Sequence, residues 1–494
     1  MFYPDLNHVK KLSGKHNLIP VALEVYADME TPISIFKRFE ESEYCFLLES
    51  VEGGEKWARY SFIGKNPYLI VSSKGNKVTI QDRDGRITVK EGNPISILKS
   101  IMQKYKSADI PGMPRFCGGA VGFFGYDLIR HYENLPDVPR DDIDLPESHF
   151  MFADELIAFD HLKQKMVIIV NMHVDMNIER SYNTAVSRLK EIYHEIISKK
   201  WKSYGYIDNK QEDAKKQLFI QSNMTKEEYC SNVEIAKQYI KDGDIFQVVL
   251  SQRFSAETDV NPVNVYRALR ISNPSPYMYY LKFGDYSIAG ASPEMLVRVE
   301  NGTVETCPIA GTRGRGRTIE EDEELERELL EDDKELAEHM MLVDLGRNDL
   351  GKVSKFGSVK VRNLKHIEKY SHVMHIVTNV QGVMREDKDA FDALIAVMPA
   401  GTVSGAPKVR AMQIIDELEN VKRGVYSGAI GYLSFNGNLD SCITIRTVIF
   451  KGKKAYIQAG AGIVADSVPE REYEETLKKA KAILKALEEA GEIL

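Results

Sequence analysis

The chain is poor in the features that mark secreted, membrane and zinc-cluster proteins. It has five scattered cysteines without C-x-x-C spacing, which argues against a disulfide framework or a structural zinc site. No apolar run reaches the roughly 20 residues that a membrane helix needs. Residues 1–11 also lack the apolar core of a secretory signal. The sequence therefore predicts a cytoplasmic protein that does not associate with membranes. The cysteines are Cys45, Cys117, Cys230, Cys307 and Cys442.

An excess of basic residues is also missing. The chain has 65 Lys and Arg against 73 Asp and Glu, a formal charge of −8 that gives no electrostatic footprint for nucleic acid. Hydrophobic residues make up 43% and charged residues 28%, so a substantial packed core is expected. The length of 494 residues predicts two or three domains, or one large fold with an appended domain.

Strand-like segments are mixed with amphipathic helices, which predicts an α/β (α+β) fold with large antiparallel sheets. Strands are expected at 44–50, 152–174 (two strands), 246–254 and in a series at 424–459. Tight turns are expected at Asp82–Gly85, Asn301-Gly302 and Asn436-Gly437. Helices are expected at 94–105, 176–199, 225–241 (after the capping-box pair Thr225 and Glu228), 319–345 and 469–490.

A polar, charge-rich stretch without sustained periodicity covers residues 200–223 and is predicted to be a linker. It divides the sequence into an N-terminal region, residues 1–200, and a C-terminal region, residues 224–494.

Two glycine-rich segments suggest a ligand near the backbone. Gly460-x-Gly462-x-x-Ala465 fits the dinucleotide fingerprint only formally, because no helix follows at once. Residues 401–408 look like a phosphate loop, but the spacing is wrong and Pro407 precedes the lysine. Two interpretations stay open: plain turns, or loops whose bare amides approach an anion.

Carboxylates recur one helical turn apart in two separate helices, as Glu335 with Glu338 and Glu472 with Glu475. Most such pairs are solvated faces or partners of lysine. Two carboxylates from different helices, completed by water and substrate oxygens, would also suit Mg²⁺.

Histidines and arginines in apolar strands are further candidates. His372 and His375 are three residues apart, which puts them on opposite faces of a strand and disfavours a shared metal. Such a histidine is either a hydrogen-bonded core residue or an acid–base group. Arg423 and Arg446 need a partner, which is either a substrate carboxylate or a protein Asp or Glu.

The C-terminal half, from about residue 225, closely resembles the chorismate-utilising enzymes, in particular their anthranilate synthase component I branch. The strings that carry the resemblance stand in family order: IFQVVLSQRF (245–254), NPSPYMYY (273–280), ASPEMLVR (291–298), PIAGTRGRGR (308–317), EHMMLVDLGRNDLG (338–351), HVMHIVTNVQG (372–382), PAGTVSGAPK (399–408), YSGAIGYL (426–433), DSCITIRT (440–447) and QAGAGIVADSVPE (458–470).

This resemblance implies a lyase that converts chorismate and ammonia to anthranilate and pyruvate with Mg²⁺, at the first step of tryptophan biosynthesis. It implies Glu338 and Glu475 as metal ligands, with Glu472 nearby. It implies His375 in proton transfer and Thr402 lining the site. The implied chorismate contacts are Gly311, Thr312, Tyr426, Arg446, Gly460, Ala461 and Gly462.

Sister activities differ at two positions. Family members that add water resemble one another in having a lysine base where this chain has Gln247, so ammonia is the favoured nucleophile. Many aminodeoxychorismate synthases have lysine where this chain has Ala310, although that branch remains the alternative. A second alternative is a non-catalytic tryptophan-binding regulator on the same fold, which the intact site residues disfavour.

Regulation and a partner subunit follow from the same resemblance. Leu48, Glu49 and Ser50, together with Pro276, Tyr277 and Met278, resemble the tryptophan pocket of feedback-inhibited members. None of the cysteines lies in a G-x-C-x-G nucleophile turn, so ammonia is expected from a glutamine amidotransferase subunit. The family suggests a heterotetramer, a dimer of such pairs.

Overall fold

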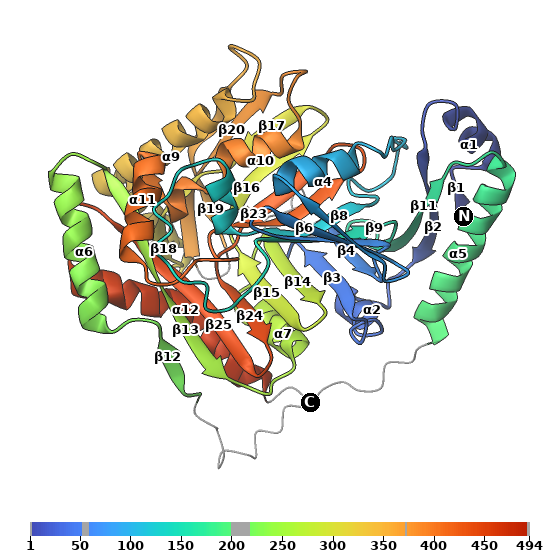
Figure 1. Cartoon of the computed structure of the whole chain (residues 1–494). Coiled ribbons are helices and arrows are strands. Elements are labelled where there is room, and N and C mark those ends of the chain that lie inside the picture. Colours follow the sequence, from blue (N-terminus) through green and yellow to red (C-terminus); the bar gives the residue numbers. More distant parts are fainter. Residues whose placement is uncertain (1, 52–58, 199–217, 371–372, 492–494) are drawn as a thin grey trace.

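Two large antiparallel sheets with helices on their outer faces make up the computed structural model of the chain, which describes residues 2–51, 59–198, 218–370 and 373–491 (Figure 1). The sheets have 13 and 12 strands and are called sheet A and sheet B below. The fold class predicted from the sequence is confirmed.

Sheet A runs from the N-terminal strand to the edge of the C-terminal half. Its order is β1 (Phe2–Tyr3), β2 (Leu18–Tyr26), β11 (Lys165–His173), β10 (Glu155–Asp160), β4 (Tyr60–Lys65), β3 (Tyr44–Glu49), β14 (Tyr277–Phe283), β15 (Tyr286–Ser292), β24 (Thr447–Lys451), β25 (Lys454–Ile463), β13 (Gln247–Glu257) and β12 (Ile220–Ser222), with β21 (Gly405–Ala406) also paired to β13.

Sheet B also contains strands from both halves of the sequence. Its order is β18 (Ile309–Gly314), β20 (Val373–Val383), β17 (Thr303–Thr306), β16 (Met295–Glu300), β23 (Leu439–Ile443), β22 (Ala429–Ser434), β8 (Gly119–Phe124), β9 (Ser148–Ala153), β5 (Leu69–Lys74), β6 (Lys77–Asp82) and β7 (Ile87–Glu91), with β19 (Lys360–Lys369) also paired to β20.

Both sheets combine strands from the two halves of the sequence. In sheet A, β3 pairs with β14 and Glu49 stands opposite Met278. In sheet B, β8 pairs with β22 and Phe123 stands opposite Ile430. The N-terminal and C-terminal regions are therefore joined by continuous backbone hydrogen bonding. Most of the predicted linker lies outside the described residues, and its last part contains β12.

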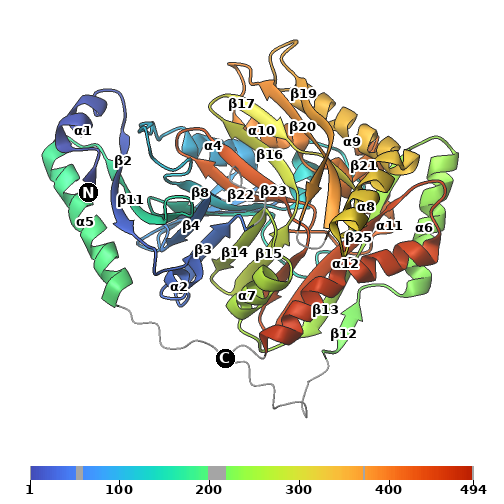
Figure 2. The same ribbon diagram turned by 180° about the vertical axis from the view of Figure 1, so that it is seen from behind.

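The core has a layer of apolar side chains between the sheets and one on each outer face. Between them, Phe46 and Phe62 of sheet A pack with Val121 and Phe123 of sheet B. The outer face of sheet A is covered by α5 (Ile178–Ser198), α7 (Pro262–Ser272) and α12 (Pro469–Ala490). Sheet B is covered by α4 (Pro94–Met102), α9 (Asp333–Gly351) and α10 (Ala390–Val397). Further helices are α1 (Leu6–Leu12), α2 (Pro32–Phe36), α6 (Lys226–Lys241), α8 (Ile319–Glu331) and α11 (Lys408–Leu418). In Figure 2, α7 and α12 lie side by side over sheet A.

Several local predictions are confirmed. Thr225 caps α6, with Oγ1 accepting from the Glu228 amide at 3.1 Å while the Glu228 carboxylate accepts from the Thr225 amide at 2.7 Å. Asn301 and Gly302 both have positive φ, 50° and 76°, as the tight turn between β16 and β17 requires.

Two expected boundaries are wrong. The single helix at 319–345 is two helices, because Asp332 is extended and its carboxylate caps the amides of Lys334 and Glu335 at 3.1 Å each. The strand series expected from residue 424 begins only at Ala429, since residues 424–428 form a loop that carries Tyr426.

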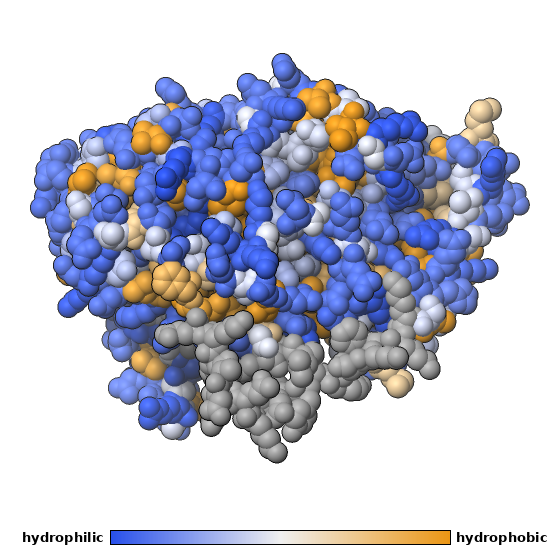
Figure 3. All heavy atoms as spheres, turned by 60° about the horizontal axis from the view of Figure 1, so that its bottom comes forward, coloured by the Kyte–Doolittle hydropathy of each residue, from blue (hydrophilic) through white to orange (hydrophobic). Residues whose placement is uncertain are grey.

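On the face drawn in Figure 3, hydrophilic residues predominate and hydrophobic ones form separate patches. Within the described ranges, no helix is both long enough and apolar enough to cross a lipid bilayer.

Candidate functional site

Glycines 460 and 462 form the floor of the candidate site in β25. They pair with β13, with Gly460 opposite Ser251 and Gly462 opposite Val249. A Cβ on Gly460 would lie 2.9 Å from Oη of Tyr426, and one on Gly462 would lie 2.7 Å from Nε2 of Gln247. The absence of side chains at these two positions lets Tyr426 and Gln247 approach the strand closely.

Gln247 connects this floor to the first acidic helix. Its Nε2 donates to Oε1 of Glu338 at 3.4 Å. Its buried Oε1 has no hydrogen-bond partner within the described ranges. A buried acceptor without a protein partner is unfavourable unless a ligand or water fills the position.

Gly311, Thr312 and His375 form the opposite wall, where β18 pairs with β20 around an irregularity in register. Gly311 has a φ of +67°, which favours glycine. Nδ1 of His375 lies 3.0 Å from the Gly311 carbonyl oxygen and 3.0 Å from Oγ1 of Thr312. A carbonyl only accepts, so Nδ1 carries the proton and Nε2 is left as the basic nitrogen. Burial lowers the pKa of His375 and favours the neutral ring. Its companion His372 lies outside the described residues.

The two predicted acidic pairs come from α9 and α12. Burial, with the charge of Glu335 added to it, raises the pKa of Glu338. Burial also raises the pKa of Glu472, to which the charge of Glu475 adds. Lys334 and Lys479 act electrostatically on both Glu338 and Glu472, so the pairs share one environment.

The side chains of the described residues do not form a complete metal-binding site here. Among the described residues, no group of three or more His, Cys, Asp or Glu side chains is placed to hold a metal ion. Instead, Nζ of Lys479 lies 2.8 Å from Glu475 and donates to the Gly460 carbonyl at 2.9 Å. A cation held here would draw its remaining ligands from water and substrate, as Mg²⁺ commonly does.

Glu294 belongs to the site although no role was predicted for it. It directly precedes β16, is 8% exposed, and both of its carboxyl oxygens lie 3.2 Å from Oγ1 of Thr402. Burial raises the pKa of Glu294 to about 8, against the opposing effects of Thr402, Arg446 and Lys479. The only signal in the sequence was a glutamate amid apolar residues in ASPEMLVR. Lys479, one turn after Glu475, was missed as well.

The two candidate arginines differ in what holds them. Arg423 is fully buried and pairs with Glu419 at 2.6 Å, so its partner is a protein carboxylate. Arg446 is partly buried and makes no ion pair with any described residue, and its removal from water lowers its pKa. The backbone of Arg446 has a φ of 49°, which is unusual for a residue other than glycine. Backbone strain of this kind is common at functional sites. Arg446 is therefore free to take an anionic ligand.

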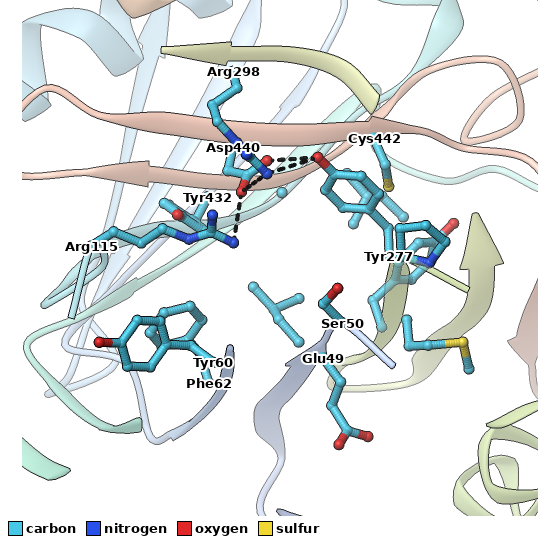
Figure 4. Close-up of a pocket in the computed structure, with 16 residues that line it drawn as sticks. Glu49, Ser50, Tyr60, Phe62, Arg115, Tyr277, Arg298, Tyr432, Asp440 and Cys442 are labelled. Carbon is cyan, nitrogen blue, oxygen red and sulfur yellow. Dashed lines mark hydrogen bonds and ion pairs between the residues drawn. The ribbon is translucent and has the colours of Figure 1, made fainter. Parts of the chain in front are cut away.

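The six residues predicted for tryptophan line one pocket between the sheets, separate from this site. They are Leu48, Glu49, Ser50, Pro276, Tyr277 and Met278. In Figure 4, Ser50 faces the pocket while the carboxylate of Glu49 turns away from it. Glu49 is bound instead by Oη of Tyr266 at 2.5 Å and Nε of Arg270 at 3.1 Å.

One wall of this pocket is a buried cluster around Asp440. Its carboxylate accepts from Arg298 at 2.9 Å and from Oη of Tyr277 at 3.0 Å, and lies 3.1 Å from Arg115 (Figure 4). Phe62 and Tyr432 supply aromatic surface beside it. The pocket thus combines aromatic walls with arginines, which suits an aromatic ligand that bears a carboxylate.

Three segments of sheet B connect the pocket to the site. Each carries a pocket residue four positions along the chain from a site residue. The pairs are Arg298 with Glu294, Ile430 with Tyr426, and Cys442 with Arg446.

Comparison with known proteins gives consistent similarity along the chain. The profile of the chorismate binding enzyme family matches residues 43–485. The chain is 70% identical over 493 residues to anthranilate synthase component 1 of Acetivibrio thermocellus, with 100% of both chains covered. It is 48% identical to anthranilate synthase component 1 of Aquifex aeolicus, over 99% of this chain and 98% of that one. The crystal structure of anthranilate synthase component I from Streptococcus pneumoniae TIGR4 aligns with a TM-score of 0.76 at 42% identity, over 88% of this chain and 95% of that chain.

Proposed function

The chain belongs to the chorismate binding enzyme family, and on that basis we propose that it is the large subunit of an anthranilate synthase. It converts chorismate and ammonia to anthranilate and pyruvate, a lyase reaction that begins tryptophan biosynthesis. The observation that carries this proposal is full-length identity of 70% to such a subunit, in a chain whose buried Glu294 contacts Thr402 and lies near the partly buried Arg446.

Substrate binding follows from the charges of the site. Chorismate has two carboxylates, one on the ring and one on the enolpyruvyl group. We assign the enolpyruvyl carboxylate to Arg446, which has no ion-pair partner within the described residues, and to the backbone around Gly460 and Gly462. Oη of Tyr426 lies against Gly460 and would complete this contact.

Proton transfers fall to two buried side chains. Glu294 is neutral at pH 7 because its pKa is raised to about 8, so it can donate a proton to the departing 4-hydroxyl group. Nε2 of His375 is unprotonated and can accept the ring proton at C2 when pyruvate leaves. Gln247 has no acid–base group, so it can orient ammonia, itself a nucleophile, but cannot deprotonate water.

A bound Mg²⁺ supplies Lewis-acid stabilisation of the ring carboxylate and the leaving oxygen. The donor set fits, since Glu338 and Glu472 both have carboxyl pKa values raised by burial and by an acidic neighbour, which a cation would offset. We assign Glu338 and Glu475 as ligands, with Glu335 and Glu472 in support. Lys479 must leave Glu475 for that to happen.

An external source of ammonia is also proposed. Burial raises the pKa of all five cysteine thiols, for example to about 12 for Cys45 and Cys117, so none is a ready thiolate nucleophile for glutamine. A glutamine amidotransferase subunit would supply the ammonia, and tryptophan would inhibit through the pocket beside Ser50.

The test is turnover of chorismate by the purified chain with Mg²⁺ and an ammonium salt, followed by anthranilate fluorescence and mass analysis of the products. Anthranilate that disappears on adding EDTA is the expected result. If an aminated chorismate accumulates instead, the chain belongs to the aminodeoxychorismate branch. Ala310 argues against that branch, because its methyl group is not a nucleophile.

A further inference from the structure

The ion pair between Arg423 and Glu419 is among the most deeply buried in the molecule. The two side chains are 1% and 3% exposed. Nε of Arg423 donates to Oε2 of Glu419 at 2.9 Å, and Nη2 donates to Oε1 at 2.6 Å, a bidentate fork. Glu419 caps the end of α11, and Arg423 precedes the loop that carries Tyr426.

The remaining donors of Arg423 bind backbone and side chains on three other segments. Nη1 donates to the Val403 carbonyl at 2.6 Å and to Oγ of Ser427 at 3.3 Å, while Nη2 donates to the Val249 carbonyl at 2.7 Å. Oε1 of Glu419 accepts from the amide and the hydroxyl of Ser251 at 2.8 Å each.

Each contacted residue stands beside a candidate site residue. Val403 follows Thr402, and Ser427 follows Tyr426. On β13, Val249 and Ser251 are the register partners of Gly462 and Gly460. The guanidinium carbon of Arg423 also lies 5.6 Å from the centre of the Tyr426 ring. One ion pair thus joins the segment of Thr402, the loop of Tyr426 and β13, the strand that pairs with the glycines of β25.

The loop that follows Arg423 is held from the other side by the N-terminal half. The Gly424 amide donates to Oδ2 of the buried Asp127 at 2.9 Å, and the Gly424 carbonyl accepts from the Tyr126 amide at 2.7 Å. The Tyr126 ring lies 4.9 Å from the guanidinium carbon of Arg423. The position of Tyr426 is therefore fixed on both sides of this loop.

Stability alone does not explain such a pair. A buried ion pair adds little net stability, and apolar residues of similar volume often serve as well or better. The hydrogen bonds of the Arg423 guanidinium instead fix the relative positions of three chain segments. We infer that Arg423 and Glu419 form a positioning unit, which holds Thr402, Tyr426 and the Gly460–Gly462 backbone at the spacing that chorismate requires. This inference rests on the proposed function.

The experiment uses the full chain with Arg423→Lys, which keeps the charge and removes the fork. The matched control is Arg188→Lys, because Arg188 makes a bidentate pair with Glu155 on α5 and β10, outside the site. A displacement of about 1 Å can cost about 100-fold in rate. We expect Arg423→Lys to lower kcat/KM for chorismate about 100-fold while thermal unfolding stays cooperative, and the control to change it less than threefold.

A double-mutant cycle separates positioning from general support. Tyr426→Phe is measured in the wild type and in the Arg423→Lys background. A positioning role predicts that the effect of Tyr426→Phe shrinks at least tenfold once the fork is lost. Two effects that multiply independently, or a folded Arg423→Lys with kcat/KM within threefold of the wild type, would overturn the inference.

Two further measurements keep the outcomes distinct. Should Arg423→Lys fail to fold, Glu419→Gln retains the shape and the acceptor for Ser251, and its kcat/KM is expected to fall about tenfold. A folded Glu419→Gln with unchanged kcat/KM would also refute the unit. If the wild type makes no anthranilate, the proposed function fails, whereas weaker chorismate binding by Arg423→Lys in calorimetry would still support positioning.

Discussion

Oγ1 of Thr402 lies 3.2 Å from each carboxyl oxygen of Glu294, so the 3-10 turn at Gly401–Val403 and the start of β16 meet at one buried acid. A hydroxyl has a single proton and cannot donate fully to both oxygens. Such an arrangement suits a carboxylic acid that keeps its own proton until a substrate oxygen needs it. The consequences can be measured in both rate and stability.

The rate of anthranilate formation should fall on the alkaline side through about pH 8. Burial raises the pKa of Glu294 to about 8, and a general acid is lost as its proton leaves. Glu294→Gln should lower kcat by a factor of about 10² to 10⁴ and remove this alkaline limb. The measurement is a pH profile of kcat between pH 6 and 9.5. A limb that persists in Glu294→Gln would assign the titration to another group.

Glu294 should also lower the free energy of unfolding at high pH. Its folded pKa lies above its usual value of 4.5, so the folded state binds more protons between the two. The stability that this group contributes is fully present below about pH 4.5 and is lost as the pH rises towards 8. The free energy of unfolding of Glu294→Gln, relative to that of the wild type, should therefore increase from pH 5 to pH 8. Urea titrations at both values test this, and an advantage that does not change with pH would contradict it.

Removal of the metal should abolish turnover, and Glu338→Gln should reproduce that loss. The amide keeps the contact with Gln247 but lacks the charge that attracts Mg²⁺. Calorimetric titration of Mg²⁺ in the presence of chorismate should show at least tenfold weaker binding. Glu324→Gln, an exposed glutamate on α8, is the control and should bind normally. Wild-type Mg²⁺ affinity in Glu338→Gln would remove this residue from the ligand set.

Tryptophan at millimolar concentration should inhibit the enzyme, and Ser50→Phe should weaken that inhibition at least tenfold. Ser50 faces the pocket, so a benzyl group there would occupy ligand space (Figure 4). Turnover without tryptophan should change little. Ser100→Phe, on the exposed side of α4, controls for the added bulk. Full activity of the wild type in millimolar tryptophan would leave the pocket without this role.

The isolated chain should use ammonium salts and not glutamine. Burial raises the pKa of its cysteine thiols, so none is a ready thiolate for the thioester that glutamine cleavage requires. Anthranilate formation in a pure preparation should therefore depend on ammonium, with its rate rising with ammonium concentration at a fixed pH. Glutamine-dependent turnover without a second protein would refute the need for a partner.

Sequence reasoning found most of the elements because their signals are local. The capping box at Thr225, the Asn301-Gly302 turn and the α12 periodicity each depend on a few neighbouring residues. The break at Asp332 was missed, since charge and helix propensity continue across it and only the cap reveals it. The loop before β22 was missed because its Gly424 is held by hydrogen bonds to Asp127 and Tyr126, which are far away in the sequence.

The site was predicted less completely than the elements. Resemblance supplied residues such as His375 and Arg446, but residue type could not show that Nδ1 of His375 faces the Gly311 carbonyl. Glu294 has no distinguishing pattern in the sequence, since its chemistry comes from burial beside Thr402. The partner of Arg423 was left open as a substrate or a protein carboxylate, and only packing decides between them.

The three segments of sheet B that carry both pocket and site residues bear on the engineering of tryptophan-tolerant enzymes. Substitutions at Ile430 or Cys442 act on chain segments that also hold Tyr426 or Arg446, so relief from inhibition there should come with slower catalysis. Ser50 follows β3, a strand that carries none of the candidate site residues. Strains built to overproduce tryptophan should therefore gain more flux from changes beside Ser50 than from changes on those shared segments.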